Sequence, residues 1–232
     1  MNELALFAGA GGGILGSILL GHRIVCAVEL DPYCREILLR RQEDKILPPV
    51  PVWDDIRSFS GEPWRGLVDV MSAGFPCQPW SVAGKRQGQN DSRNLWPDTI
   101  RVIREVGPAI AFLENVPGLV RSDYFGQILG DLAEAGFDAG WDVVSAGEIG
   151  ALHRRQRLWI LAHTDRTGLE EPRQPFPETT EKPSTHRQGN NGQGWWLSEP
   201  DVGRVAHGVA HRLDRLKALG NGQVPRVAQV AW

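Results

Sequence analysis

The stretch GFPCQPWS, Gly74 to Ser81, places one cysteine between two prolines directly after an apolar run. Proline fixes the φ angle and has no backbone N–H, so Pro76 and Pro79 predict a stiff loop at Cys77 rather than a helix or a central strand. A thiolate is a strong nucleophile, but only a few per cent of an ordinary thiol is ionised at neutral pH. Cys77 is therefore either an activated nucleophile or a small buried side chain, and this stretch alone favours packing.

Two other motifs carry groups that can move or hold charge. Glu114 ends the apolar run AIAFLENV, where apolar neighbours would raise its pKa and let it act as an acid. Capping the following turn is an equal alternative for this carboxylate. Arg155 and Arg157 enter the run RLWILAH two residues apart, so both point to the same side of an extended chain. They can engage a phosphate or a base edge together, or form a basic surface at the strand entrance.

The stretch FAGAGGG, Phe7 to Gly13, lies between a predicted strand and a predicted helix. Glycines let the backbone approach a ligand closely, and the start of a helix offers free N–H groups. The next predicted strand ends at Glu29, where a carboxylate can accept hydrogen bonds from ribose hydroxyls. Together these features predict an adenosine-containing cofactor without separating NAD from S-adenosylmethionine. Residues 4–20 are apolar but lack a basic leading region and contain five glycines, so we interpret them as a strand and a turn, not as a targeting signal.

Short apolar runs alternate with helical patterns through the first 165 residues. The predicted strands are LALFAGA, RIVCAVEL, VDVMSAG, AIAFLENV, WDVVSAG and RLWILAH. The predicted helices between them are DPYCREILLRRQED, SRNLWPDTIRVIREV and DYFGQILGDLAEAG. This alternation predicts an α/β fold with a mostly parallel sheet and helices on both faces. Ligands of such sheets bind beyond the carboxyl ends of the strands. Residues 165–194 are rich in Pro, Gly, Thr, Asn and Gln and predict a long loop or a disordered insert.

The composition is that of an ordinary globular protein, with 41% hydrophobic and 23% charged residues. Three cysteines are too few and too scattered for a disulfide framework or a C-x-x-C metal site, which predicts a reducing, intracellular setting. Residues 1–150 carry 13 Lys and Arg against 20 Asp and Glu, whereas residues 151–232 carry 12 against 8. A basic carboxy-terminal region suits a polyanionic ligand, although charge alone slightly favours a solvated surface.

Taken in order, these motifs resemble those of the cytosine-C5 DNA methyltransferases. The matching residues are Phe7, Gly9 and Gly11; Glu29 with Asp31-Pro32-Tyr33; Asp55-Ile56; Gly74 to Ser81; Glu114 to Val116; His153 to Arg157; and Gly220 to Pro225 with Asn221. The match spans most of the chain, with a gap at about residues 165–200. His153 stands where the family has glutamine. The family's closing motif is G-N-x-x-x-P, with three variable positions, and it matches Gly220 to Pro225; the region before it is much shorter than in typical members. The ending WWLSEPDVGRVAHGVAHRLDRLKALGNGQVP resembles that of compact phage and prophage members.

The resemblance implies a Rossmann-like fold that depends on S-adenosylmethionine. It implies a catalytic domain at residues 1–164, a reduced target-recognition region at 165–212, and a segment at 213–232 that returns to the catalytic domain. The implied cofactor-binding residues are Phe7, Ala8, Gly9, Gly11, Gly12, Glu29, Leu30, Asp55, Ile56, Pro76, Asn221 and Gly222. The implied DNA-binding residues are Gln78, Ser81, Lys85, Arg86 and Arg155.

The mechanism that the resemblance implies is covalent catalysis on a cytosine flipped out of duplex DNA. The Cys77 thiolate adds to C6, which makes C5 reactive enough to take the methyl group. Glu114 supplies a proton at N3, and Arg155 holds the base carbonyl and ring, with Arg157 supporting that site or a neighbouring phosphate. Residues 81–94 are expected to close over the DNA, and a short target site, weak discrimination or help from a second chain is expected.

The expected partner is double-stranded DNA, with neither a membrane nor a metal. A monomer in the cytoplasm is favoured, and a cognate restriction endonuclease is one candidate partner. Three other functions stay open. The first is methylation of cytosine in RNA, such as transfer RNA; the second is an NAD-dependent dehydrogenase, which the glycine loop and Glu29 alone would allow; the third is a non-catalytic DNA-binding relative.

Overall fold

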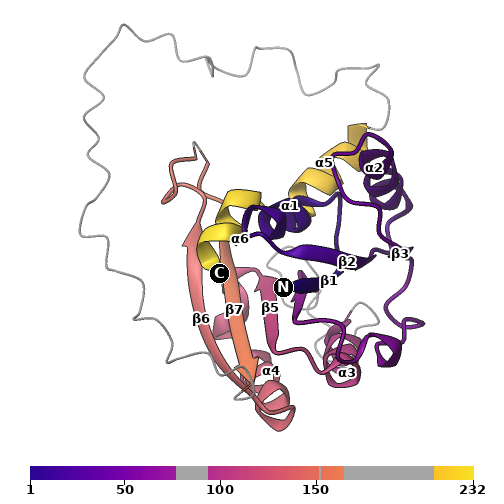
Figure 1. Ribbon diagram of the computed structural model, residues 1–232. Helices are drawn as coiled ribbons and strands as arrows, with labels where there is room; N and C mark the ends of the chain where they lie inside the picture. Colours follow the sequence, from indigo (N-terminus) through magenta and orange to yellow (C-terminus); the bar gives the residue numbers. More distant parts are fainter. Residues whose placement is uncertain (77–93, 152, 165–211) are drawn as a thin grey trace, which may run out of the picture.

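The computed structural model describes residues 1–76, 94–151, 153–164 and 212–232, and within them the strands form one seven-stranded sheet (Figure 1). The order across the sheet is β3-β2-β1-β4-β5-β7-β6. The strands are β1 Asn2–Leu6, β2 Arg23–Val28, β3 Val52–Trp53, β4 Val70–Ala73, β5 Ile110–Asn115, β6 Phe137–Ser145 and β7 Gln156–Thr164. The first five are parallel, whereas β7 is antiparallel to both β5 and β6. The predicted mostly parallel α/β sheet is confirmed, and its β6–β7 edge makes it mixed.

Helices cover both faces of this sheet, as predicted. They are α1 Gly12–Leu19, α2 Pro32–Glu43, α3 Trp96–Val106, α4 Asp123–Glu134, α5 Arg212–Asn221 and α6 Pro225–Ala231, with short 3-10 turns at Glu62–Trp64 and Pro117–Arg121. Alternate residues of β5 point to opposite faces. Ala111 and Leu113 pack in the large cluster that contains α3 and α4, whereas Phe112 packs with α6. A third cluster joins α1 and α2 to β1 and β2.

The helix ends follow local rules. Asp31 caps α2 by accepting hydrogen bonds from the backbone N–H groups of Tyr33 and Cys34, and Pro32 occupies the first helical position. Helix α3 ends at Gly107, whose φ of 61° lies in the left-handed region that glycine adopts without strain. No helix of the described ranges has both the length and the apolar composition needed to cross a membrane.

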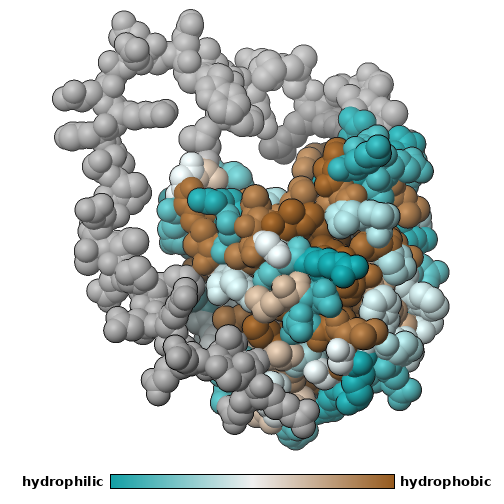
Figure 2. All heavy atoms as spheres, viewed as in Figure 1, coloured by the Kyte–Doolittle hydropathy of each residue, from teal (hydrophilic) through white to brown (hydrophobic). Residues whose placement is uncertain are grey.

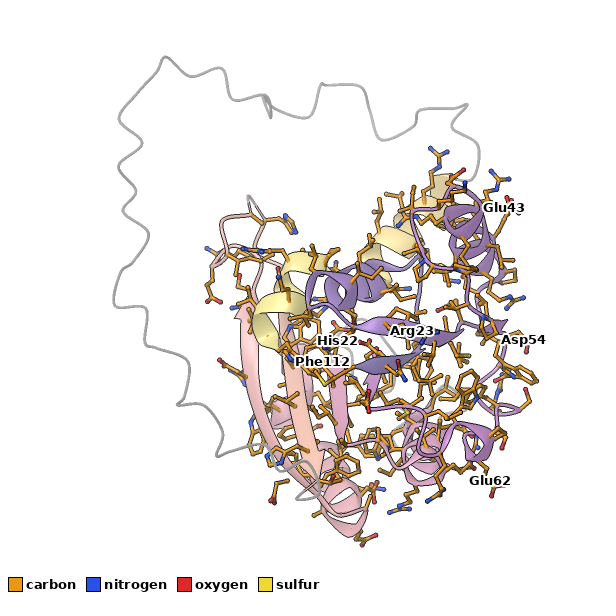
Figure 3. The ribbon with its side chains drawn as sticks, in the orientation of Figure 1. His22, Arg23, Glu43, Asp54, Glu62 and Phe112 are labelled. Atoms are coloured by element: carbon orange, nitrogen blue, oxygen red, sulfur yellow. The ribbon has the colours of Figure 1, made fainter. Side chains whose placement is uncertain are left out.

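The carboxy-terminal segment packs on the core of the sheet domain. Gly16 of α1 leaves room for α6, since a Cβ at this position would lie 2.8 Å from the Ala228 Cβ and 2.9 Å from the Pro225 carbonyl oxygen. The Trp232 ring contacts His22 and Phe112, with ring centres 4.6 and 5.3 Å apart. Figure 3 shows His22 and Phe112 together beside α6, far from the outer helix α2. This packing brings the turn between α5 and α6 to the edge of the sheet.

Candidate active site

The glycine-rich loop follows β1 and turns sharply into α1. Phe7, Gly9 and Gly11 all have positive φ angles, of 54°, 54° and 89°. The Ala8 N–H donates to the Val28 carbonyl oxygen at 3.1 Å, which ties the loop to the end of β2. Only glycine adopts such angles freely, so Gly9 and Gly11 allow the tight turn that leaves the backbone accessible to a ligand.

Glu29, at the end of β2, is bound by two backbone N–H groups. Gly9 donates to its Oε2 at 2.6 Å and Asp31 donates to its Oε1 at 2.7 Å. Burial raises the pKa of the Glu29 carboxyl, and the two N–H donors act against this rise. Each carboxylate oxygen keeps a further lone pair that can accept a hydrogen bond from a ligand. The side chain of Leu30, the next residue, is half exposed.

Asp55 and Ile56 lie after β3, next to this strand end. The Asp55 carboxylate accepts hydrogen bonds from the backbone N–H and the Nε of Arg57, each at 3.0 Å, and Arg57 holds the pKa of Asp55 below its usual value. Ile56 is buried, and its carbonyl oxygen accepts a hydrogen bond from Arg101 of α3 at 2.7 Å. The loop that carries both residues is therefore held from α3.

Gly74, Phe75 and Pro76 continue from β4 toward Cys77. The Nδ2 of Asn115, at the end of β5, donates to the Phe75 carbonyl oxygen at 3.1 Å, and Asn115 is buried. Asn115 therefore fixes the backbone just before the nucleophile candidate, a role that sequence reasoning missed. The candidate residues Cys77, Gln78, Ser81, Lys85 and Arg86 lie outside the residues that the structure describes.

Glu114 is buried at the end of β5, with an exposed fraction of 8%. The Nε of Arg157, at the start of β7, lies 2.8 Å from its Oε1. Burial raises the pKa of the Glu114 carboxyl, and Arg157, Arg155 and a hydrogen bond with Gln223 act against that rise. The carboxyl group is thus held in a site that favours its protonated form while cations lie beside it.

Arg155 and Arg157 donate hydrogen bonds to different partners, although both guanidinium groups act on the Glu114 carboxyl. Arg155 donates through its terminal nitrogen to the carbonyl oxygens of Gly220, at 3.0 Å, and of Gly222. Its φ of 29° is in the left-handed region, which costs energy for a residue with a side chain. Arg157 binds Glu114, whereas Arg155 holds the turn that contains Asn221.

A small cavity of about 30 Å³ joins the cofactor candidates to Glu114. Its lining residues from the predicted site are Phe7, Ala8, Gly9, Glu114, Asn221 and Gly222, together with Ser72 and Ala73 of β4, Gly74 after it, and Gln223. Glu29, Leu30, Asp55 and Ile56 lie outside this cavity, at the ends of β2 and β3. Gly11 and Gly12 start α1, and Pro76 follows β4. The structure therefore brings the predicted acid directly to the glycine loop.

A larger cleft of about 810 Å³ opens between α1, α2, α5 and the entrance of β7. Basic side chains line it: Arg41, His153, Arg155, Arg157 and Arg215. Figure 2 shows apolar residues gathered over α1, α5 and α6 on this face, with hydrophilic residues over α2. Among the described residues, no three His, Cys, Asp or Glu side chains gather as metal ligands would. The cleft is suited to a ligand that is a polyanion and that also exposes apolar groups.

A family model of C-5 cytosine-specific DNA methylases matches residues 1–204 of this sequence. The chain belongs to the C-5 cytosine-specific DNA methylase family. Type II methyltransferase M.NgoMIV of Neisseria gonorrhoeae is 33% identical over 186 residues, which cover 77% of this chain and 58% of that methylase. Members of this family use S-adenosylmethionine as methyl donor, so the family membership argues against the NAD-dependent dehydrogenase.

Solved structures show the same methylase fold. A putative DNA modification methyltransferase encoded within a prophage of E. coli is 25% identical, with a TM-score of 0.60, over 74% of this chain and 49% of that one. A mutant of Spodoptera frugiperda DNMT2 is 22% identical, also with a TM-score of 0.60, over 75% of this chain and 53% of that one. The chain spans about half the length of the methylases that it matches.

Proposed function

We propose that this protein is a DNA (cytosine-5-)-methyltransferase that uses S-adenosylmethionine. The observation that carries the proposal is the small cavity in which Glu114 faces the glycine loop, because it places an acid beside the expected cofactor. Membership of the C-5 cytosine-specific DNA methylase family supports the same chemistry.

The residues at the strand ends fit the proposed cofactor. Glu29 has acceptor capacity left for ribose hydroxyls, and the left-handed glycine loop lies next to it. Leu30 is half exposed next to Glu29 and offers an apolar surface for an adenine ring. Bound there, S-adenosylmethionine supplies an electrophilic methyl group. The Asp55 carboxylate is engaged by the side chain of Arg57.

The protein's own groups prepare the cytosine. The Cys77 thiolate forms a bond to C6, which raises the electron density at C5, and Glu114 delivers a proton at N3 as this happens. The raised pKa of Glu114 suits a proton donor, because burial disfavours the ionised form of the carboxyl. We assign the contact with Glu114 to Arg157. To Arg155 we assign the support of the turn between α5 and α6, called the closing turn below.

A base in a stacked duplex cannot reach this site, so the cytosine must flip out, at a cost of a few kcal/mol. The basic cleft beside the cavity supports phosphate contacts that would offset this cost. We further propose that residues 165–212 act as a reduced target-recognition region. The packing of α6 on α1 supports the return of residues 213–232 to the catalytic domain.

Two proposals concern the biological setting. The Type II methyltransferases among the relatives support a cognate restriction endonuclease as a partner. We place the activity in the cytoplasm, on duplex DNA, with the protein as a monomer.

The test is transfer of a tritiated methyl group from S-adenosylmethionine to duplex DNA and to RNA of the same sequence. We expect incorporation into DNA, at least a thousandfold loss in Cys77→Ser in line with removal of an enzyme's nucleophile, and nearly unchanged cofactor binding by calorimetry in that variant. Cys26→Ala serves as the matched control, because Cys26 is a buried cysteine of β2. Preference for RNA, or full activity of Cys77→Ser, would contradict the proposal.

A further inference from the structure

Gln223 stands at a variable position of the closing motif, yet its backbone and side chain contact three parts of the site. A Cβ at Gly12 would collide with the Gln223 carbonyl oxygen, and a Cβ at Gly13 would collide with its Oε1. A Cβ at Gly74 would lie 3.0 Å from its Nε2. Gln223 therefore fits between the start of α1 and the end of β4 only because glycines face it on both sides.

The amide of Gln223 meets the Glu114 carboxyl in the space above Gly74. Glu114 Oε2 lies 3.1 Å from the position of a Gly74 Cβ, next to the Gln223 Nε2, and the two side chains are hydrogen-bonded. The other oxygen of Glu114, Oε1, is bound by Arg157. The carboxyl group is thus held from two directions, by a cation of β7 and by an amide of the closing turn.

We propose that Gln223 is a positioning residue that fixes the Glu114 carboxyl beside the glycine loop and sets its readiness to give up a proton. The part of this inference that concerns methyl transfer rests on the proposed function. The contacts themselves do not depend on it, because they involve only groups of this chain.

The physical effect of Gln223 has a definite direction. An N–H that donates to a carboxylate stabilises the ionised form, so this contact lowers the pKa of Glu114 and opposes the rise that burial causes. Within residues 1–76, 94–151, 153–164 and 212–232, the charged groups that act on Glu114 are Arg157 and Arg155, and both act in the same direction as Gln223. Loss of the amide removes one of the groups that counteract the effect of burial. The pKa of Glu114 therefore rises further, and Glu114 becomes a weaker acid.

The position of Gln223 is set by the rest of the carboxy-terminal segment. Arg155 holds the carbonyl oxygens of Gly220 and Gly222, directly before it. Helix α6, which begins two residues after it, is held on α1 by close packing of Ala228 and Pro225 against Gly16. The segment therefore places one amide between the acid and the cofactor loop.

The experiment compares Gln223→Ala and Gln223→Asn with the control Gln229→Ala. The control removes an amide of the same segment that contacts neither Glu114 nor the glycine loop. The pKa of Glu114 is measured by NMR in protein labelled with carbon-13 at the glutamate carboxyl, and the signal is assigned by its loss in Glu114→Gln. We expect a higher pKa in both Gln223 variants and the wild-type pKa in Gln229→Ala. An unchanged pKa in a folded Gln223 variant would overturn the proposal.

A second measurement follows kcat of methyl transfer against pH at saturating cofactor and DNA. A general acid loses activity as pH rises above its pKa, so the falling limb should move to higher pH in the Gln223 variants by the shift that NMR gives. A lower kcat with an unmoved limb would contradict the positioning role. If the wild-type protein transfers no methyl group, the proposed function fails, whereas the NMR titration still decides the role of Gln223. Gln223→Asn retains an amide too short for the contact and covers the case in which Gln223→Ala does not fold.

Discussion

Two carboxylates stand at the ends of parallel strands in this site, the partly buried Glu29 and the buried Glu114, and they are held in different ways. Glu29, after β2, is bound by the backbone N–H groups of Gly9 and Asp31. Glu114, at the end of β5, is bound by the side chains of Arg157 and Gln223. Burial raises the pKa of both. The two carboxylates differ in the groups that counteract this rise in pKa, which are backbone N–H groups at Glu29 and side chains at Glu114.

Backbone donors are part of the fold, because they are present whatever side chains surround them. The donors of Glu29 come from the loops that it connects, so this carboxylate fixes the shape of a binding site. The donors of Glu114 come from β7 and from the closing turn, and each is a side chain that a substitution can remove. We infer that Glu29 serves to bind a ligand, whereas the side chains around Glu114 set the pKa of a proton donor.

The sharpest test of this difference is Glu114→Gln, for which we expect the largest effect. Loss of a general acid lowers the rate of the chemical step by about 10²- to 10⁴-fold. Cofactor affinity should change little, because the glycine loop and Glu29 remain. The rate is measured by methyl transfer to duplex DNA, and the affinity by calorimetry. The control is Glu43→Gln, an exposed glutamate at the end of α2 (Figure 3). A cofactor affinity that falls as strongly as the rate would remove the distinction.

Glu29→Ala should show the opposite pattern. Hydrogen bonds to a charged group contribute about 1.5–3 kcal/mol, which corresponds to a loss of roughly 10- to 100-fold in affinity for S-adenosylmethionine. The rate at saturating cofactor should stay within a few-fold of wild type, since Glu114 and Arg157 are untouched. Calorimetry and a cofactor titration of the rate check the two halves of this prediction. Glu36→Ala is the control, because Glu36 is an exposed residue of α2 that pairs with Arg40. Unchanged affinity in Glu29→Ala would show that the carboxylate only shapes its own loop.

The sequence predicted the strand ends of this site because their signals are local. Apolar runs, the glycine loop and the acidic residue after β2 each lie within a short stretch, and the parallel sheet then brings the strand ends together. Two parts of the sheet were not predicted in full. Strand β3, Val52–Trp53, is too short to show any periodicity. Strand β6 starts at Phe137, ahead of the expected run, in a stretch where Asp138 and Gly140 are exposed.

The contacts that hold the acid could not be predicted in the same way. Gln223 occupies a position that the closing motif leaves variable, so no pattern marks it. The distinct partners of Arg155 and Arg157 depend on where the turn after α5 lies, and the contact of Asn115 with Phe75 depends on the pairing of β4 with β5. Such contacts join segments far apart in the chain, and only the packed structure specifies them.

The smallest expected effect is on stability. A carboxyl whose pKa is higher in the folded than in the unfolded protein favours folding in its protonated form. Its contribution to stability is fully present at pH values below its pKa in the unfolded protein, which is about 4.3 for glutamate. The contribution is lost as pH rises through its pKa in the folded protein. Glu29 and Glu114 both act in this sense, whereas Asp31, Asp55 and Glu105, whose pKa values are lowered, act in the opposite sense.

The informative quantity is therefore the difference in unfolding free energy between wild type and variant, followed by urea denaturation from about pH 4 upward. Relative to wild type, Glu114→Gln and Glu29→Gln should each gain stability as pH rises. Wild type loses its stabilising protonated carboxyl over this pH range, whereas each variant has no carboxyl at that position to ionise. The gain should be larger for Glu114→Gln, since Glu114 is buried more completely than Glu29. Glu43→Gln, at an exposed position of α2, is the control. If the stability of Glu114→Gln relative to wild type instead fell with rising pH, Arg157 and Gln223 would lower the pKa of Glu114 by more than burial raises it. The pKa values of Glu29 and Glu114 would then be shifted in opposite directions, in addition to having different hydrogen-bond partners.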